Sequence, residues 1–397
     1  MTPRHQRRIG RQAFLIVVCI AASSTTSYNR SIRSIRGNVR FAIEAAGREA
    51  TRSGEWELTL RPASSEPIGL ITAAAFCEDE VFLLDSRQSV AHRIDLLTAS
   101  ETGAIGASSD GPDQPRRPRA MAIDCAGHTL YLIDRTGVFV FSLTSGGVEG
   151  HFSHPANFSY TGGTALVDAP NGALYVPGLW TAAKWSDWLH RDLDRMFEGD
   201  RVGYRLSLRD GTTKPLFKPL ERGCWSVSAS CLQAVFDEVR TGGPERWVAA
   251  QRVSTRVGLF DAQFRLQRVL DVRSPRFREN GQRLGRHDSV TDQTRWREDN
   301  STIERVYAFG DRIVTVHTTH ATKDWMPGQP IDFDVHMNIH SLDGAPLVSD
   351  VRLPDLPVAR DDRNLYVLDY GRGGRRIGTD RVTLIRYPIV AGWKLFQ

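Results

Sequence analysis

The sequence lacks the signatures that mark the best-known enzyme and cofactor classes. It has no nucleophile elbow, no phosphate-binding P-loop, no HExxH motif and no Rossmann fingerprint. No two cysteines stand at the C-x-x-C spacing that is typical of zinc sites. Sequence motifs alone therefore name neither a reaction nor a substrate.

Excess charge is also scarce once the N-terminus is set aside. The formal net charge of +5 includes four arginines in an N-terminal segment without acidic residues: Arg4, Arg7, Arg8 and Arg11. Without them, 47 basic side chains remain against 46 acidic ones. A nearly neutral body argues against a nucleic-acid partner, which would require a basic face.

The most prominent apolar run lies near the N-terminus and is only ten residues long. Residues 13–22 (AFLIVVCIAA) follow the arginines, and small residues at 21–27 come next. This order predicts a secretory signal over residues 1–26, too short to remain as a transmembrane span. A buried N-terminal helix is the structural alternative. Cys19 suggests a lipid anchor as an alternative to cleavage by an ordinary signal peptidase. A lipobox, however, has a small residue directly before its cysteine, and this sequence has Val18 there. We expect an exported protein, periplasmic or extracellular.

Cysteine usage agrees with export. Besides Cys19, the chain contains Cys77, Cys125, Cys224 and Cys231. An even number in an exported chain permits two disulfides. Cys77 and Cys125 each end the first strand of consecutive repeats, so this pair would join neighbouring units, and Cys224 with Cys231 would close a short loop. Other pairings, and free buried thiols, remain open.

A repeated β-meander organises the chain. Residues 119–152 contain four short apolar runs separated by Gly-containing turns, which predicts a four-stranded antiparallel unit. Related runs recur to the C-terminus; the second strands read VFLLD, LYLID, LYVP and LYVLD. We divide the chain into the signal (1–26), an N-terminal lead-in (27–53) and six repeats (54–397).

Six such units predict an all-β, six-bladed propeller with four-stranded antiparallel blades, because radial closure buries both faces of each sheet. The sixth repeat lacks a clear fourth strand. Either residues 56–60 (WELTL) or residues 393–396 (WKLF) would complete it.

The second repeat resembles the NHL and TolB-like class of six-bladed propellers. The residues that carry the resemblance are Pro118, Ala122-Ile123-Asp124, Gly127, Leu130-Tyr131-Leu132-Ile133-Asp134 and Val138-Phe139-Val140-Phe141. Residues 364–369 repeat the second half. Repeats three to five depart from the pattern: Pro177 replaces an aspartate, and the fourth repeat lacks the tyrosine. The resemblance implies a fold but no single activity.

The repeat topology predicts one insertion-rich face. In a four-stranded meander, the connections between strands two and three emerge on the same face as the connections between blades. The longest segments all belong to these two types: 106–119, 178–201, 274–304, 317–335 and 371–381. Long loops are where function concentrates. We therefore expect the binding surface on this face.

Three groups of residues on this face are candidate sites. Trp180, Trp185 and Trp188 lie in residues 178–201, where the spacing predicts an amphipathic helical insertion in blade three. The tryptophans would bind a sugar ring or peptide, or would only fix the helix to the propeller. Arg372, Arg375 and Arg376 would clamp a carboxylate or phosphate, or form a solvated loop.

The third group is a metal-site candidate in blade five. It comprises His317, His320, Asp332, Asp334 and His336. Ordinary strand and loop histidines are the alternative interpretation, since no tight motif is present. The recurring Asp85, Asp134 and Asp369 could form an acidic ring, but strand-end aspartates usually bond turn backbone.

Two functions follow from these patterns. The first is an exported binding propeller without a cofactor, which uses the insertion-rich face for a protein, glycan or other small ligand. The alternative is a calcium- or metal-dependent hydrolase or lactonase with an axial site, which requires several oxygen ligands from different blades. A structural repeat within an envelope assembly is a third reading.

Overall fold

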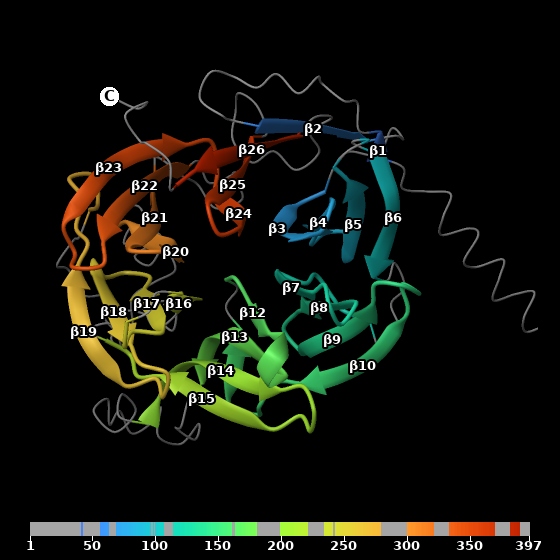
Figure 1. Cartoon of the computed structure of the whole chain (residues 1–397), viewed down its shortest axis with the longest axis horizontal. Helices are drawn as coiled ribbons and strands as arrows, with labels where there is room; N and C mark the ends of the chain where they lie inside the picture. Colours follow the sequence, from blue (N-terminus) through green and yellow to red (C-terminus); the bar gives the residue numbers. More distant parts are fainter. Residues whose placement is uncertain are drawn as a thin grey trace, which may run out of the picture.

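Six antiparallel sheets surround one central axis (Figure 1). The computed structural model describes residues 41–42, 56–62, 69–96, 98, 100–106, 114–160, 163–180, 199–220, 234–240, 243–278, 300–320, 333–369 and 382–389. This arrangement confirms the predicted all-β six-bladed propeller. Within these ranges no helix combines the length and apolar character needed to cross a membrane.

The first three blades follow the predicted repeats. Blade I contains β3 (Ile71–Cys77), β4 (Glu80–Asp85), β5 (Val90–Asp95) and β6 (Ser100–Gly106). Blade II contains β7 (Ala120–Asp124), β8 (Thr129–Ile133), β9 (Gly137–Ser142) and β10 (Val148–Ser153). Blade III contains β12 (Leu166–Asp168), a short 3-10 helix η1 (Ala169–Asn171), β13 (Ala173–Trp180), β14 (Arg201–Ser207) and β15 (Thr213–Phe217). An additional strand, β11 (Phe158–Tyr160), pairs with the end of β13.

The next blades have the same order. Blade IV contains β16 (Ala234–Glu238), β17 (Trp247–Gln251), β18 (Arg256–Phe260) and β19 (Leu266–Asp271). Blade V contains β20 (Thr302–Phe309), β21 (Arg312–His320), β22 (Phe333–Ser341) and β23 (Pro346–Leu353). Blade VI begins with β24 (Pro357–Arg360), β25 (Asn364–Asp369) and β26 (Val382–Pro388).

The N-terminal part of the chain completes blade VI. Strand β2 (Trp56–Pro62) pairs antiparallel with β26, from Trp56 opposite Arg386 to Leu60 opposite Val382. A two-residue strand, β1 (Phe41–Ala42), pairs with the outer side of β2. The sequence left two segments as candidates for the closing strand. The N-terminal segment takes this position, and residues 393–396 lie outside the described residues.

The core is divided into six apolar clusters, one at each interface between adjacent blades. Strand β4 shows how alternation builds them. Val81 and Leu83 pack toward blade VI, whereas Phe82 and Leu84 pack toward blade II. Because both faces of this strand are covered, it reads as a continuous apolar run rather than an alternating one.

The helical insertion predicted for blade three falls largely outside the described residues. Strand β13 ends at Trp180 and β14 begins at Arg201, whereas residues 181–198 are not described. The insertion therefore stays a prediction.

Candidate functional site

The strand order places the long connections on one face, as the sequence predicted. In each blade the first strand lies nearest the axis, and the second, third and fourth follow outward. Neighbouring strands pair antiparallel, so the chain direction reverses at every step. The connections β13–β14, β21–β22 and β25–β26 therefore leave from the same face as the inter-blade connections β6–β7 and β19–β20. We call this the insertion-rich face and the other the opposite face.

The opposite face is closed by short turns with repeated aspartate caps. Asp124, Asp168 and Asp361 each accept a hydrogen bond from a backbone N–H within their own turn. The hydroxyl of Tyr366 in β25 also donates to Asp361 Oδ2 at 2.7 Å, and that of Tyr175 to Asp168 Oδ2 at 3.4 Å. The tyrosine and the first aspartate of the repeat thus form a structural latch.

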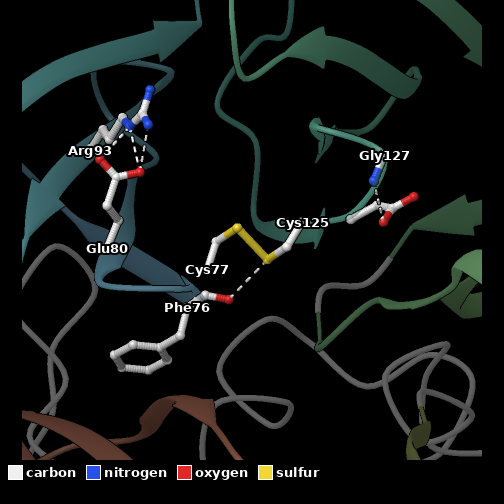
Figure 2. The surroundings of a disulfide bond; sticks show 7 residues. Phe76, Cys77, Glu80, Arg93, Cys125 and Gly127 are labelled. Atoms are coloured by element: carbon white, nitrogen blue, oxygen red, sulfur yellow. Dashed lines mark hydrogen bonds and ion pairs between the residues drawn. A yellow bond between two sulfur atoms is a disulfide. The ribbon is translucent and has the colours of Figure 1, made fainter.

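The disulfide also lies on this opposite face. Cys77 at the end of β3 is bonded to Cys125, which follows β7, with their Cα atoms 5.5 Å apart (Figure 2). Phe76, beside the bond, packs against Tyr366 of blade VI with ring centroids 4.2 Å apart. Blades VI, I and II are therefore connected near the axis. Cys224 and Cys231 lie outside the described residues.

Two of the three recurring strand-end aspartates, Asp85 and Asp134, accept hydrogen bonds from the turns that follow them. Asp85 Oδ1 accepts from the backbone N–H groups of Arg87 and Gln88 at 2.9 and 3.1 Å. Asp134 accepts from Thr136 and from the N–H of Arg116. Asp369 ends β25, and the connection after it is not described.

Trp180 belongs to an aromatic group at the interface of blades II and III. Its ring lies 6.2 Å from that of Tyr204, which contacts Phe158 edge-on at 4.6 Å. His154 bonds the Tyr204 hydroxyl at 2.7 Å and the carbonyl of Asp134 at 2.8 Å. Trp180 is thus packed into the propeller wall on its insertion-rich side. Trp185 and Trp188 lie outside the described residues.

The blade V histidines form a buried row that faces blade IV. Val335, Met337 and Ile339 of β22 pack toward blade VI, so alternation turns His336, Asn338 and His340 the other way. His317 of β21 lies directly opposite His336, and their rings stack at 5.4 Å.

Hydrogen bonds of Asn338 fix the tautomer of His317. Asn338 Oδ1 accepts from the backbone N–H of Asp350 at 2.8 Å, so its amide nitrogen donates to His317 Nδ1 at 3.0 Å. His317 then carries its proton on Nε2. Burial, followed by the charge of His336, lowers the pKa of His317 to about 4. Burial also lowers the pKa of His336 and of His340.

The other metal-site candidates of blade V are only partly described. Asp334 is paired with Arg352 at 2.7 Å. His320 ends β21, and Asp332 lies outside the described residues. In the part of the chain that the structure describes, no group of three or more His, Cys, Asp or Glu side chains is placed to hold a metal ion. Arg372, Arg375 and Arg376 are likewise outside that part.

Two charged pairs were not anticipated from the sequence. Arg252 and Glu304 form an ion pair that links blades IV and V on the insertion-rich face. Burial raises the pKa of Glu304, but the Arg252 charge and hydrogen bond outweigh it, and the pKa is lowered. Nearer the opposite face, Asp237 of β16 is paired with Arg360 of β24 at 2.6 Å. The sequence feature that could have indicated this second pair is an aspartate within the mostly apolar strand AVFDE.

Comparisons with known proteins agree with the fold. No protein-family model and no curated protein matches the sequence. A solved member of the DUF4221 family from Bacteroides vulgatus matches with a TM-score of 0.60 and 9% identity, covering 88% of this chain and 99% of that chain. Hydrazine synthase from Kuenenia stuttgartiensis matches with a TM-score of 0.43 and 15% identity, over 76% of this chain and 74% of that chain. At 9% identity the likeness to the DUF4221 protein shows the fold alone, and the narrower resemblance to NHL and TolB-like propellers stays a prediction.

Proposed function

We propose that this protein is an exported binding propeller that engages a protein, glycan or other small ligand on its insertion-rich face. The observation that carries the proposal is the strand order, which brings the connections 181–200, 272–301 and 321–332 out of one face. The opposite face has short, capped turns instead. Loops held on a rigid scaffold are a common way to build a recognition surface.

The disulfide supports the exported location. Disulfides persist in secreted and periplasmic proteins and are rare in the reducing cytosol. The Cys77–Cys125 bond and the N-terminal signal-like segment together favour export. N-terminal sequencing of the protein from the natural cell envelope and from the medium tests this: a mature chain that starts near residue 27 is expected, and an intact N-terminus in the cytosol would contradict it.

Binding to glycan and peptide arrays tests the recognition surface. The unmodified protein is compared with W185A/W188A, which removes two aromatic side chains from the 181–200 connection. T144A/Q263A is the matched control, because both residues are exposed in turns of the opposite face. We expect bound spots to be lost in the first variant and retained in the second. Equal binding by all three proteins, or no bound spot at all, would contradict the proposal.

The metal-dependent hydrolase is the second candidate, and no observation in the described residues favours it. Among them, no group of three or more His, Cys, Asp or Glu side chains is placed to hold a metal ion. We expect the melting temperature to be the same with and without a chelator. A stoichiometric metal whose removal lowers that temperature would bring the hydrolase back, and lactone and ester substrates would then be assayed.

A further inference from the structure

The connection between blades IV and V leaves and re-enters the propeller at one point on the insertion-rich face. The backbone N–H of Arg278 donates to the hydroxyl of Ser301 at 2.9 Å, and the backbone N–H of Ser301 donates to the carbonyl of Arg278 at 2.9 Å. Ser301 is only 1% exposed. These reciprocal bonds join residues 23 positions apart. The two ends of the stretch 279–300 are therefore tied together.

The outgoing end of this connection is fixed to blade V by Phe277. The backbone N–H of Phe277 donates to the carbonyl of Ser274 at 3.1 Å, which closes a turn. The half-buried ring of Phe277 contacts the ring of His317 edge-on, with centroids 5.4 Å apart. It also packs against the apolar cluster between blades IV and V. The turn therefore directs one aromatic side chain into the interface of these blades.

The buried histidine row supports Phe277 from below. Asn338 donates to the ring of His317 at 3.0 Å and is itself held by the backbone N–H of Asp350 at 2.8 Å. His317 also stacks on His336. These two histidines and Asn338 are each 1% exposed, and close-packed buried side chains have few alternative positions. The row thus provides a fixed platform for the connection.

The returning end of the connection is anchored to both blades. The backbone N–H of Ile303 donates to the carbonyl of Arg252 in blade IV at 2.6 Å. The hydroxyls of Thr302 and of Thr318 in β21 share a hydrogen bond at 3.0 Å. The Arg252–Glu304 ion pair follows directly. Both ends of the connection are therefore held in place by the propeller.

We propose that Phe277 and Ser301 are positioning residues of the recognition surface, because they fix the point at which the connection between blades IV and V meets the propeller. The inference rests on the proposed function and names residues that hold the insertion-rich face ready for binding. Fixing both ends of a chain segment lowers the entropy that is lost when binding orders it. Neither residue needs to touch the bound glycan or peptide for this effect.

Trypsin cleavage of the folded protein tests the positioning without a ligand. The stretch 279–300 contains four cleavage sites, which mass spectrometry follows: Arg283, Arg286, Arg295 and Arg297. We expect F277A/S301A to be cleaved there about fivefold faster or more, because local opening becomes more frequent. Phe277→Leu keeps an apolar side chain on His317 and should be cleaved at nearly the unmodified rate.

F76A/S142A is the matched control. It removes the same two kinds of side chain from the opposite face, where Phe76 packs on Tyr366 and Ser142 accepts from the backbone N–H of Thr144 at 3.3 Å. The control should leave cleavage within 279–300 unchanged. Equal acceleration in F277A/S301A and in the control would show a general loss of stability and would overturn the positioning role.

The glycan and peptide arrays supply the second measurement. At a temperature where circular dichroism shows the variants to be folded, F277A/S301A should bind about fivefold more weakly or worse than the control. If the double variant does not fold, S301A alone is compared with S142A.

Unchanged cleavage in F277A/S301A, or faster cleavage with unchanged array binding, would overturn the positioning role. Array binding that still depends on Trp185 and Trp188 would then leave the proposed function standing. The absence of any bound spot with the unmodified protein would overturn both.

Discussion

The carboxylate of Asp237 on β16 accepts a 2.6 Å hydrogen bond from the guanidinium of Arg360 on β24, across 123 positions of sequence. Its second oxygen accepts from the backbone N–H of Ala308 on β20 at 2.9 Å. One side chain therefore joins the innermost strands of blades IV, V and VI. Both partners are almost fully buried, at 2% exposure for Asp237 and 11% for Arg360.

Breaking this pair should be costly. Asp237→Ala leaves the Arg360 charge buried without its partner, for which a loss of about 3–5 kcal/mol in the free energy of unfolding is expected. Urea denaturation followed by circular dichroism measures it. Arg240→Ala is the control, because its pair with Asp362 is largely exposed and such pairs contribute about 1 kcal/mol or less. Similar losses in the two variants would contradict the structural role of Asp237.

The Cys77–Cys125 disulfide should stabilise the ring. It closes a loop over a sequence separation of 48, so its removal in C77S/C125S should cost about 2–4 kcal/mol. Thermal melts of the unmodified protein with and without dithiothreitol, and of the variant under both conditions, measure this. Because the variant lacks this disulfide, any effect of dithiothreitol on its melting temperature arises from the remaining cysteines. A variant as stable as the oxidised protein would show that the bond contributes nothing to blade packing.

Acid should weaken the interface of blades IV and V. In the folded protein the pKa of His317 is about 4, below the ordinary value of about 6.5 for an unfolded chain. The unfolded state therefore binds more protons between these values, and stability is lost as pH falls from about 6.5 to 4, by about 2–3 kcal/mol. The groups facing His317 are His336 and Asp350, and Arg276 acts on His336.

Urea denaturation at pH 7 and pH 5 tests this dependence. His317→Gln should reduce the pH-dependent loss, because the titrating group is gone. His128→Asn is the control, since that histidine is exposed on a turn of blade II with a φ of 50°, a backbone conformation that asparagine tolerates. If the loss between the two pH values is the same in His317→Gln as in the unmodified protein, His317 is not its source.

Ring closure by the N-terminal strand predicts a sharp effect of truncation. A chain beginning at residue 40 retains β1 and β2, whereas one beginning at residue 63 leaves the edge of β26 unpaired. An unpaired strand edge favours association between molecules. We expect the shorter chain to melt earlier and to form oligomers in size-exclusion chromatography, and the longer chain to remain like the full protein. Identical behaviour would mean that β2 is dispensable for closure.

The sequence by itself determined the blades. Period-two alternation, apolar second strands and Gly- or Asp-containing turns are local properties, and they are sufficient to predict six meanders and the face from which the long connections leave. The latch between Tyr366 and Asp361 explains why the tyrosine and aspartate recur in the repeat. These features could be read because each depends on residues close together in the chain.

Only the tertiary structure decided how the ring closes and which charged side chains join its innermost strands. The choice of β2 as the closing strand and the pairing of Asp237 with Arg360 join residues that are far apart in sequence. No local pattern marks such contacts, because they arise when the sheets are arranged around one axis, and that arrangement is fixed by packing between blades.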